Sequence, residues 1–353
     1  VKADAYGHGA VNVARTALDA GATWLGVATV PEGIELRQAG LQAPILVMGA
    51  LHHIEEIRAL ARWQLQPTIV TPKQALVFTE ALTDVCVPLP VHLKLDTGMS
   101  RLGFDWRQAL EFLEFVDGLP ALQVFSMYSH FATADDANET EMRRQYNRFE
   151  RAIAALKTHN RLPGRLHLAN TAATLSDADA LQYDMVRVGL GIYGLIPAPH
   201  LKSVLSLKPG LEVKARITHL KQIAAGTGVS YGHQFVAQHP MTIAVVGIGY
   251  ADGVPRLLSN RLSVLIGDHI ALQVGAITMD QLMLDVSNIP DLKEGDVVTM
   301  ICKSCHHRIT ADDWANCIGT ISWEILCGFK HRLPRIMTGN SIRKLYPTED
   351  RLL

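Results

Sequence analysis

Short apolar runs alternate with amphipathic helical segments over the first 195 residues, and this alternation limits the folds open to the chain. Seven runs have the length and composition of buried strands: Trp24–Thr29, Pro44–Met48, Gln66–Val70, Val91–Leu95, Leu122–Tyr128, Arg165–Leu168 and Met185–Val188. Helical segments such as Glu32–Gln38, Trp106–Val116 and Glu139–Leu156 lie between them. With Val1 as the end of a further strand, eight β/α units predict an α/β fold, a (β/α)8 TIM-type barrel; periodicity alone leaves a doubly wound sheet open.

The pattern changes near the Pro-rich segment Leu195–His200. Alternating runs then predict a mostly β domain: Leu211–Ile223, Thr242–Ile248, Leu262–Ile266, Ala271–Thr278, Gln281–Val286 and Val297–Ile301. A helix from Thr310 to about Cys317 is expected to close it. We therefore assign residues 1–197 to the barrel and 198–353 to a C-terminal β domain. Because the first strand would begin before Val1, we expect the natural protein to have further N-terminal residues and the chain as given to be less stable.

Charge and composition exclude several classes of protein. The formal net charge is -1, which gives no electrostatic reason to expect a nucleic acid or a membrane surface as partner. No apolar run reaches the ~18 residues of a membrane-spanning helix, and no signal peptide is visible. An odd count of 5 cysteines argues against a disulfide framework, so we expect a cytoplasmic protein.

The opening segment Val-Lys-Ala-Asp-Ala-Tyr-Gly-His-Gly-Ala carries the first chemical signal. The amine of Lys2 can condense with an aldehyde, and the turn at Gly7 and Gly9 leaves backbone N–H groups for a phosphate. Pyridoxal 5′-phosphate (PLP) needs both features. In a barrel, active groups lie where strands end. The carboxyl ends of the predicted strands and the loops after them hold Lys94 and Arg101, His130, Asn170 and Thr171, and Arg187 with Gly189 and Leu190.

Taken in order, these segments resemble the alanine racemase family, PLP enzymes built from a barrel and a β domain. The resemblance covers nearly the whole chain and includes Ser129–Ala134, Asn170–Thr174, Val229–Gly232, Gly249–Gly253 and Thr278–Gln281. It implies a homodimer that interconverts L- and D-alanine for peptidoglycan precursors. It also implies PLP binding by Lys2, Tyr6, His130, Asn170, Thr171, Arg187, Gly189 and Leu190.

The resemblance assigns further roles around the cofactor. Lys2 and, from the partner subunit, Tyr231 would be the two catalytic acid/base groups. Arg101 and the backbone N–H of Met279 would bind the substrate carboxylate, and Lys94 matches a lysine that is carbamylated in many members. The entrance channel would include Asp135, Tyr250, Arg256, Ala276, Ile321 and Trp323. Many members have an arginine at position 276 and a tyrosine at 323, so we expect looser substrate selection.

Racemisation explains why two bases are needed, since one face of the substrate must lose a proton and the other must gain one. Tyr231 needs positive neighbours to act as a base, and a chain Arg187–His130–Tyr231 would supply them. An arginine at the pyridine nitrogen keeps its own proton, which disfavours a barrel decarboxylase with an acidic residue there. A broader amino-acid racemase and a PLP-binding homeostasis protein remain alternatives.

The segment Cys302-Lys-Ser-Cys305-His306-His307 contains the C-x-x-C-H pattern of c-type haem attachment, and it also offers zinc ligands. Haem attachment would require export, and no second ligand pair has suitable spacing. We therefore expect no metal site and a surface turn with reactive thiols. Cys86, Cys317 and Cys327 are expected to be buried as small apolar side chains.

Overall fold

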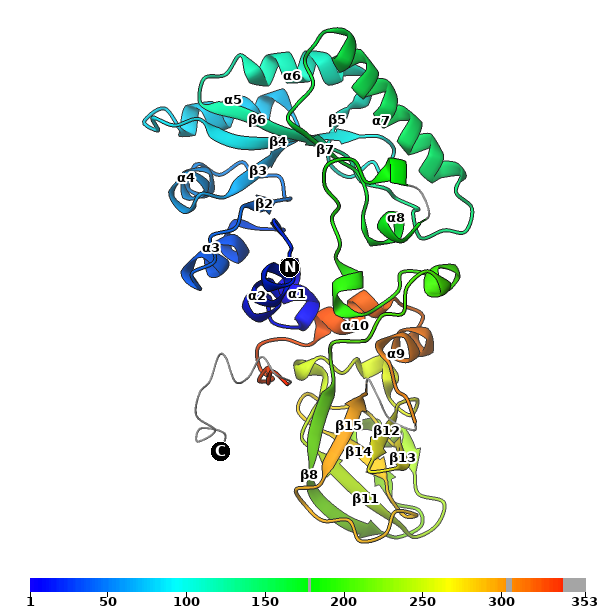
Figure 1. Cartoon of the computed structure of the whole chain (residues 1–353). Helices are drawn as coiled ribbons and strands as arrows, with labels where there is room; N and C mark the ends of the chain where they lie inside the picture. Colours follow the sequence, from blue (N-terminus) through cyan, green and yellow to red (C-terminus); the bar gives the residue numbers. More distant parts are fainter. Residues whose placement is uncertain (177–178, 303–306, 339–353) are drawn as a thin grey trace. The chain divides into compact units, whose positions relative to one another are not determined.

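A computed structural model describes residues 1–176, 179–302 and 307–338 (Figure 1). The chain divides into two compact units. The first contains Val1–Tyr6 and Ala10–Gly210, and the second contains Gly7–Gly9 and the chain from Leu211 onward. The proposed boundary between residues 197 and 198 stays a prediction. None of the described helices is long and apolar enough to span a membrane.

The first unit is built on a curved parallel sheet. Its strands are β1 (Leu25–Val27), β2 (Ile45–Val47), β3 (Gln66–Ile69), β4 (Leu89–Asp96), β5 (Phe104–Asp105), β6 (Leu122–Tyr128) and β7 (Arg165–His167). The order is β1-β2-β3-β4-β6-β7, and β5 pairs with β4. Parallel neighbours in chain order, with a helix in most connections, make this the barrel-type arrangement that the sequence predicts.

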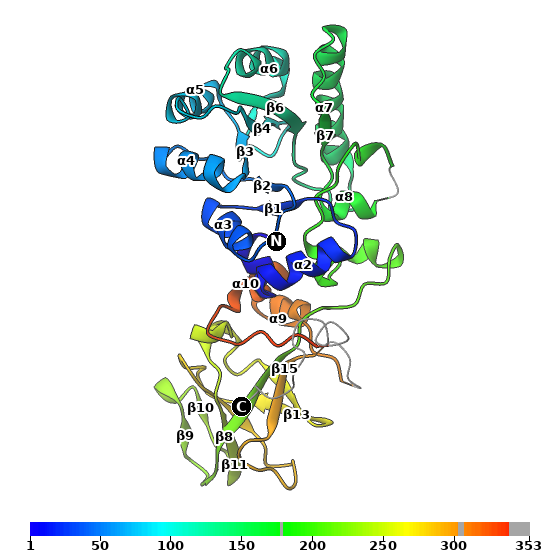
Figure 2. The same ribbon diagram turned by 60° about the vertical axis from the view of Figure 1, so that its left-hand side comes forward.

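Helices cover the outer face of this sheet. They are α2 (Ala10–Asp19), α3 (Val30–Gln38), α4 (Ile54–Trp63), α5 (Pro72–Ala81), α6 (Ala109–Asp117) and α7 (Thr140–Thr158). Figure 2 shows α3, α4, α5 and α6 following one another along one side of the sheet. A doubly wound sheet would carry helices on both faces, so the view excludes that alternative.

The two ends of the predicted barrel differ from the sequence-based expectation. The segment Met185–Val188 forms only one parallel bridge, in which Arg187 pairs with Asn170 beyond the end of β7. Lys2 does not end a strand: it begins α1 (Lys2–Gly7), whose central residues have φ between 51° and 54°. The N-terminal amine of Val1 donates to the Gly26 carbonyl at 2.8 Å and so lies beside β1.

The left-handed turn of α1 requires support, because each L-residue costs ~1–2 kcal/mol in that conformation. Two carboxylates provide it. Glu32 Oε1 accepts from the N–H of Ala3 at 2.7 Å, and Asp4 Oδ1 accepts from the N–H of Ala10 at 2.7 Å. Because these bonds come from α3 and from within the turn, the conformation of the segment after Lys2 is imposed by tertiary contacts.

The second unit contains a closed antiparallel barrel of the order β11-β14-β13-β12-β15-β8. Its strands are β8 (Val213–Ile223), β11 (Met241–Val246), β12 (Ser263–Ile266), β13 (His269–Gln273), β14 (Leu282–Asp285) and β15 (Val297–Ile301). A hairpin of β9 (Gly228–Val229) and β10 (Phe235–Val236), with α9 (Ala311–Ile318) and α10 (Ser322–Gly328), completes the unit. The mostly β prediction is confirmed, although β13 ends five residues before the predicted Thr278.

The cysteines correct two expectations. Cys86 and Cys317 are exposed and Cys327 is half-buried, so the prediction that all three are buried is wrong. Cys302, directly after β15, is buried and disulfide-bonded, so the prediction of a reactive surface thiol at that position is wrong. Cys305 and His306 lie outside the described residues.

Candidate functional site

Basic side chains gather at the carboxyl ends of β4 and the strands beside it. Lys94 on β4 is 6% exposed, and burial lowers its pKa to about 8, with further contributions from Arg101 and Arg187. The charges of Arg187, Lys94, Arg101 and Lys2 all act on His130. Asp96 is the one carboxylate that opposes them at Lys94. The sequence-predicted cations therefore converge and give this end of the unit a field that favours an anionic ligand.

Tyr128, which sequence reasoning missed as a site residue, contacts two of these cations with its aromatic ring. Its ring centroid lies 5.6 Å from Lys94 Nζ and 5.0 Å from Arg187 Cζ. Its hydroxyl is 2.8 Å from Thr68 Oγ1. The negative face of an aromatic ring stabilises cations without neutralising them. Tyr128 thus lets two buried cations coexist while the net positive charge of the site is kept.

Arg187 donates hydrogen bonds to four acceptors of the first unit. Its Nη2 donates to the Ser129 carbonyl at 2.7 Å, the Leu168 carbonyl at 3.0 Å and His130 Nδ1 at 3.1 Å. Its Nη1 donates to His167 Nδ1 at 2.8 Å. These bonds use only the two terminal nitrogens, and no described residue accepts from the Nε–H. Since guanidinium has five N–H donors and no acceptor, Arg187 can offer its Nε–H to a ring nitrogen of a ligand.

His130 has a defined protonation state in this arrangement. Because Arg187 donates to Nδ1, the ring proton of neutral His130 must be on Nε2. Burial, followed by the charge of Arg187, lowers the pKa of His130 to about 3. His130 is therefore neutral at physiological pH. It can donate a hydrogen bond toward a phenol, whereas the sequence analysis expected it to relay positive charge.

A hydroxyl, a glycine and a phenol form a second candidate anion site in the same unit, the cradle of Thr171, Gly189 and Tyr6. Asn170 caps α8 (Thr171–Leu175) by accepting from the Ala173 N–H at 3.1 Å. Thr171 Oγ1 accepts from the Gly189 N–H at 3.0 Å. A Cβ built on Gly189 would lie 3.1 Å from the Tyr6 hydroxyl. Only a residue without a side chain leaves this space, as a close approach of backbone to phosphate requires.

Tyr6 links this candidate phosphate site to Lys2. Its Nζ lies 5.9 Å from the ring centroid of Tyr6, and that ring packs 4.9 Å from the ring of Tyr193. Leu190 is buried at the start of the short helix η3 (Leu190–Tyr193), which Gly189 precedes. The structure therefore brings together Lys2, Tyr6, Thr171, Gly189 and Leu190, and their hydroxyl and backbone donors fit a phosphate.

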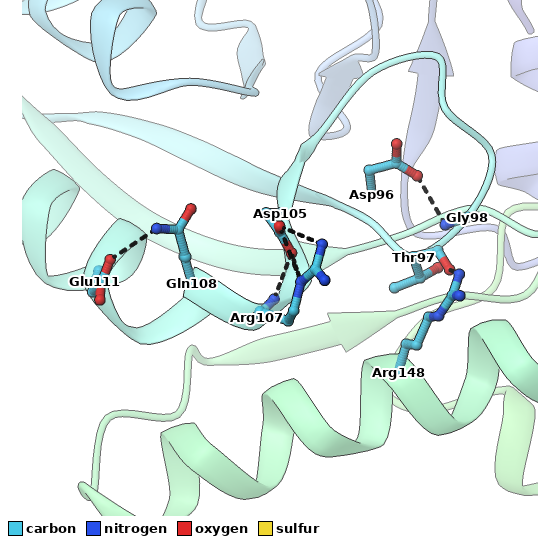
Figure 3. A network of polar contacts seen from close by, with 8 residues as sticks. All are labelled: Asp96, Thr97, Gly98, Asp105, Arg107, Gln108, Glu111 and Arg148. Atoms are coloured by element: carbon cyan, nitrogen blue, oxygen red, sulfur yellow. Dashed lines mark hydrogen bonds and ion pairs between the residues drawn. The ribbon is translucent and has the colours of Figure 1, made fainter.

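The loop that carries Arg101 is shaped by Asp96 at the end of β4. Asp96 Oδ1 accepts from the N–H groups of Gly98, Met99 and Ser100 at 2.9, 3.0 and 3.1 Å. Arg148 of α7 donates to the Thr97 carbonyl at 2.8 Å, and Figure 3 shows Asp96, Gly98, Thr97 and Arg148 together. The loop is thus fixed at its base from two sides, which restricts where Arg101 can point.

Gln145 of α7 is a further residue that sequence reasoning missed. Its Nε2 donates to the carbonyl of His130 at 3.0 Å, and its Oε1 accepts from the N–H of Ala132 at 2.8 Å. Nε2 also lies 3.3 Å from Thr97 Oγ1. A single buried amide therefore joins the loops after β4 and β6. A glutamine among charged helix residues gives no sequence signal for this.

In the second unit, Tyr231 projects from the short helix η5 (Tyr231–His233) and is 73% exposed. The preceding Ser230 donates from Oγ to the Ala276 carbonyl at 2.7 Å. Met279 is exposed, and its carbonyl accepts from the Ala251 N–H at 3.0 Å. Tyr231, Ala276 and Met279 therefore belong to loops that this unit anchors firmly, with the two predicted ligand-contacting groups facing solvent.

The predicted entrance residues differ in exposure. Tyr250 and Ile321 of the second unit are exposed, at 43% and 56%. Asp135 and Arg256 are also exposed, Trp323 is half-buried, and Ala276 is fully buried. A methyl group at position 276 therefore offers no surface to a ligand within this unit. No His, Cys, Asp or Glu cluster that suits a metal occurs in residues 1–176, 179–302 and 307–338.

The first unit is a parallel barrel-type sheet with a cation cluster that suits an anionic ligand. The second unit is a closed β barrel with an exposed tyrosine. Together they place the chain among two-domain α/β-barrel proteins that bind an anionic ligand. Family models named "Alanine racemase, N-terminal domain" and "Alanine racemase, C-terminal domain" match residues 1–197 and 210–337. The chain therefore belongs to the alanine racemase family.

Individual relatives agree. The chain is 63% identical to an alanine racemase of Nostoc sp. over 338 residues, which is 95% of this chain and 87% of that one. It is 60% identical to the Synechocystis sp. enzyme, with coverage of 96% and 90%. The crystal structure of alanine racemase from Bacillus anthracis with bound L-Ala-P has a TM-score of 0.90 and 35% identity, with coverage of 96% and 87%.

Proposed function

We propose that this protein is an alanine racemase that interconverts L- and D-alanine with PLP as cofactor. The observation that carries the proposal is the convergence of Lys94, Arg101 and Arg187 at the barrel end where Lys2 and the Tyr6–Thr171–Gly189 cradle also lie. PLP, when bound, makes the α-proton of an amino acid acidic by delocalising the charge left at Cα. The donor set on this unit fits its phosphate and its ring nitrogen.

Each residue then has a distinct task. Lys2 would hold PLP covalently and exchange a proton at one face of the substrate, while Arg101 would bind the substrate carboxylate. Arg187 would donate its Nε–H to the ring nitrogen, and because an arginine keeps its proton, that nitrogen would stay unprotonated. This argues against a decarboxylase, which would place a carboxylic acid there.

The second base would be Tyr231 of a second copy of the chain. Tyr231 and Met279 are exposed on the second unit, together with large apolar side chains such as Leu257 at 70% and Ile321 at 56%. A PLP carrier without turnover would need neither Tyr231 nor the second unit, so the proposal favours a homodimeric enzyme over a homeostasis protein.

A mixed dimer tests the shared site. Lys2→Ala and Tyr231→Phe proteins are purified separately, then unfolded, mixed and reassociated. If sites are shared, half the sites of a mixed dimer carry both substitutions and half carry none, so activity returns through the native site. Each variant reassociated with itself is the control. Mixed dimers verified by two different tags that remain inactive would contradict sharing.

The substrate is a further part of the proposal. We propose that alanine is the main substrate and that the lack of a charged side chain at position 276 relaxes selection, because the buried Ala276 presents no group to a ligand. Values of kcat/KM for alanine, serine, lysine and arginine test this directly, and turnover of alanine alone would refute the second part.

We also propose a cytoplasmic location, where precursors of peptidoglycan are made. The free thiols of Cys86, Cys317 and Cys327 support it, whereas the disulfide of Cys302 does not.

A further inference from the structure

Beneath Arg187, four hydrogen bonds form a continuous chain through the interior of the first unit. Arg187 Nη1 lies 2.8 Å from His167 Nδ1, and His167 Nε2 lies 3.0 Å from Ser126 Oγ. Ser126 Oγ lies 2.6 Å from His92 Nδ1, and His92 Nε2 lies 2.9 Å from Gln66 Oε1. The chain thus crosses four strands, because these residues come from β3, β4, β6 and β7 and the Arg187 segment that follows.

Arg187 fixes the direction of this chain. Guanidinium has no acceptor, so His167 Nδ1 must accept and the His167 proton must be on Nε2. That Nε2–H then donates to Ser126. Ser126 is fully buried and has one proton, and donating it to His92 Nδ1 is the arrangement that satisfies both groups. His92 in turn carries its proton on Nε2 and donates to Gln66 Oε1.

Burial keeps both imidazoles neutral, which the chain requires. His92, Ser126 and His167 each have 0% exposure. Burial lowers the pKa of His92 to about 3, and burial together with Arg187 lowers that of His167 well below its ordinary value. No carboxylate takes part in this hydrogen-bond chain, so none of its members can accept a proton from Arg187.

Aromatic contacts restrain the rings in the same orientations. His92 packs against Trp24 and Phe125 at centroid distances of 5.5 Å each. The ring of His167 stacks on Tyr128 at 4.6 Å with an interplanar angle of 7°. A ring flip of either histidine would therefore break packing contacts as well as two hydrogen bonds.

We propose that Ser126, His92 and Gln66 are positioning residues for Arg187: Ser126, itself held by His92 and Gln66, accepts the Nε2–H of His167 and so fixes the imidazole ring with its Nδ1 lone pair on the guanidinium. The Nε–H of Arg187 is thereby kept at a fixed angle for the cofactor ring nitrogen. The contact between Arg187 Nε–H and the cofactor rests on the proposed function. The positions of the protons on His167, Ser126 and His92 do not depend on it.

Histidine NMR tests the order of protons directly. Full-length protein labelled with 15N-histidine is examined with and without PLP, and the signals of His92 and His167 are assigned with His92→Gln and His167→Gln. We expect both residues as Nε2–H tautomers. In Ser126→Ala, His92 Nδ1 loses its donor, so His92 is expected to become a mixture of tautomers. Thr79→Val, which removes a hydroxyl that bonds only the Ala75 carbonyl within α5, is expected to leave both signals unchanged.

Kinetics then separate a positioning role from a merely structural one. Ser126→Ala is expected to lower kcat for alanine about tenfold with KM and PLP affinity nearly unchanged, and Ser126→Thr, which keeps the hydroxyl, should recover most of it. If Ser126→Ala does not fold, Gln66→Met tests the same chain from its end. An Nδ1–H tautomer of either histidine in the wild type, or unchanged tautomers and kcat in the variants, would overturn the proposal. If both histidines show the predicted tautomers but the protein racemises no amino acid, the proposed function is wrong and the inferred proton positions are still supported.

Discussion

Acid should destabilise the first unit through His92. The imidazole of His92 is fully buried and bonded at both nitrogens to neutral partners, and burial lowers its pKa to about 3. Below pH 6.5 the unfolded chain binds a proton that the folded chain excludes, so stability rises with pH in this range and falls as pH drops from 6.5 toward 3. At pH 5, ~1.5 pH units below the unfolded value, the loss is about 2 kcal/mol.

Replacing His92 by glutamine removes this proton-linked loss while keeping a donor and an acceptor. The assay is amide hydrogen exchange of β4, followed by mass spectrometry at pH 7.5 and pH 5 and corrected for intrinsic exchange rates. We expect the opening free energy of β4 to fall by about 2 kcal/mol more in the wild type than in His92→Gln. The comparison across pH cancels the cost of the substitution itself.

Phe125→Leu is the matched control, because it disturbs the packing around His92 without removing the titrating group. It should be less stable at both pH values and keep the full dependence on pH. The same fall in opening free energy for the wild type and for His92→Gln would refute the inference that His92 is a buried neutral imidazole.

Three further predictions concern single hydrogen bonds and contacts. Thr171→Val leaves the Gly189 N–H without its acceptor and should weaken PLP binding about tenfold, or ~1.4 kcal/mol, in a fluorescence titration. Asp96→Ala frees three N–H groups of the Arg101 loop and should raise KM for alanine at least about tenfold with a smaller change in kcat, as steady-state kinetics would show. Gly249→Ala places a Cβ 2.3 Å from the carbonyl oxygens of Thr278 and Met279 and should lower Tm of the second unit by several degrees in calorimetry.

Each of these substitutions has a control on the same unit. Thr174→Val removes a hydroxyl that bonds the backbone carbonyl of the N-cap residue Asn170 and no ligand-facing group, and it should leave PLP affinity unchanged. Asp105→Ala removes a half-buried carboxylate paired with the exposed Arg107, seen beside the loop in Figure 3, and should leave KM unchanged. Gly267→Ala meets no atom within 4 Å and should cost only its positive φ, about 1 kcal/mol. If a control variant changes PLP affinity, KM or Tm as much as its test variant does, the role inferred for the corresponding contact is wrong.

Much of the fold follows from apolar periodicity. The run Leu122–Tyr128 is β6 and Val297–Ile301 is β15, with the predicted bounds, since both combine alternation or continuous burial with polar ends. The β9–β10 hairpin was not predicted, because strands of two residues have no period. The segment Met185–Val188 shortens to a bridge at Arg187, although its composition is that of a buried strand.

The cations of the candidate site were predictable, whereas the groups that orient them were not. Lys94 lies near the carboxyl end of β4, and Arg101 and Arg187 lie beyond the ends of strands, where a barrel collects polar side chains. Tyr128, His92 and Ser126 lie within strands, and a sequence does not say which inward side chains meet across a sheet. The left-handed turn after Lys2 also has no local signal, because it depends on Glu32 of α3 and on Asp4.

The two-base mechanism is tested most directly by hydrogen exchange at Cα. The full-length protein with PLP is given L-alanine in deuterated water, and the first few per cent of turnover is followed by mass spectrometry of separated enantiomers. Two opposite bases predict D-alanine that carries deuterium at Cα, with L-alanine that keeps its hydrogen. D-alanine that retains the substrate hydrogen would require a single base and would contradict the roles of Lys2 and Tyr231, and no D-alanine at all would contradict the racemase.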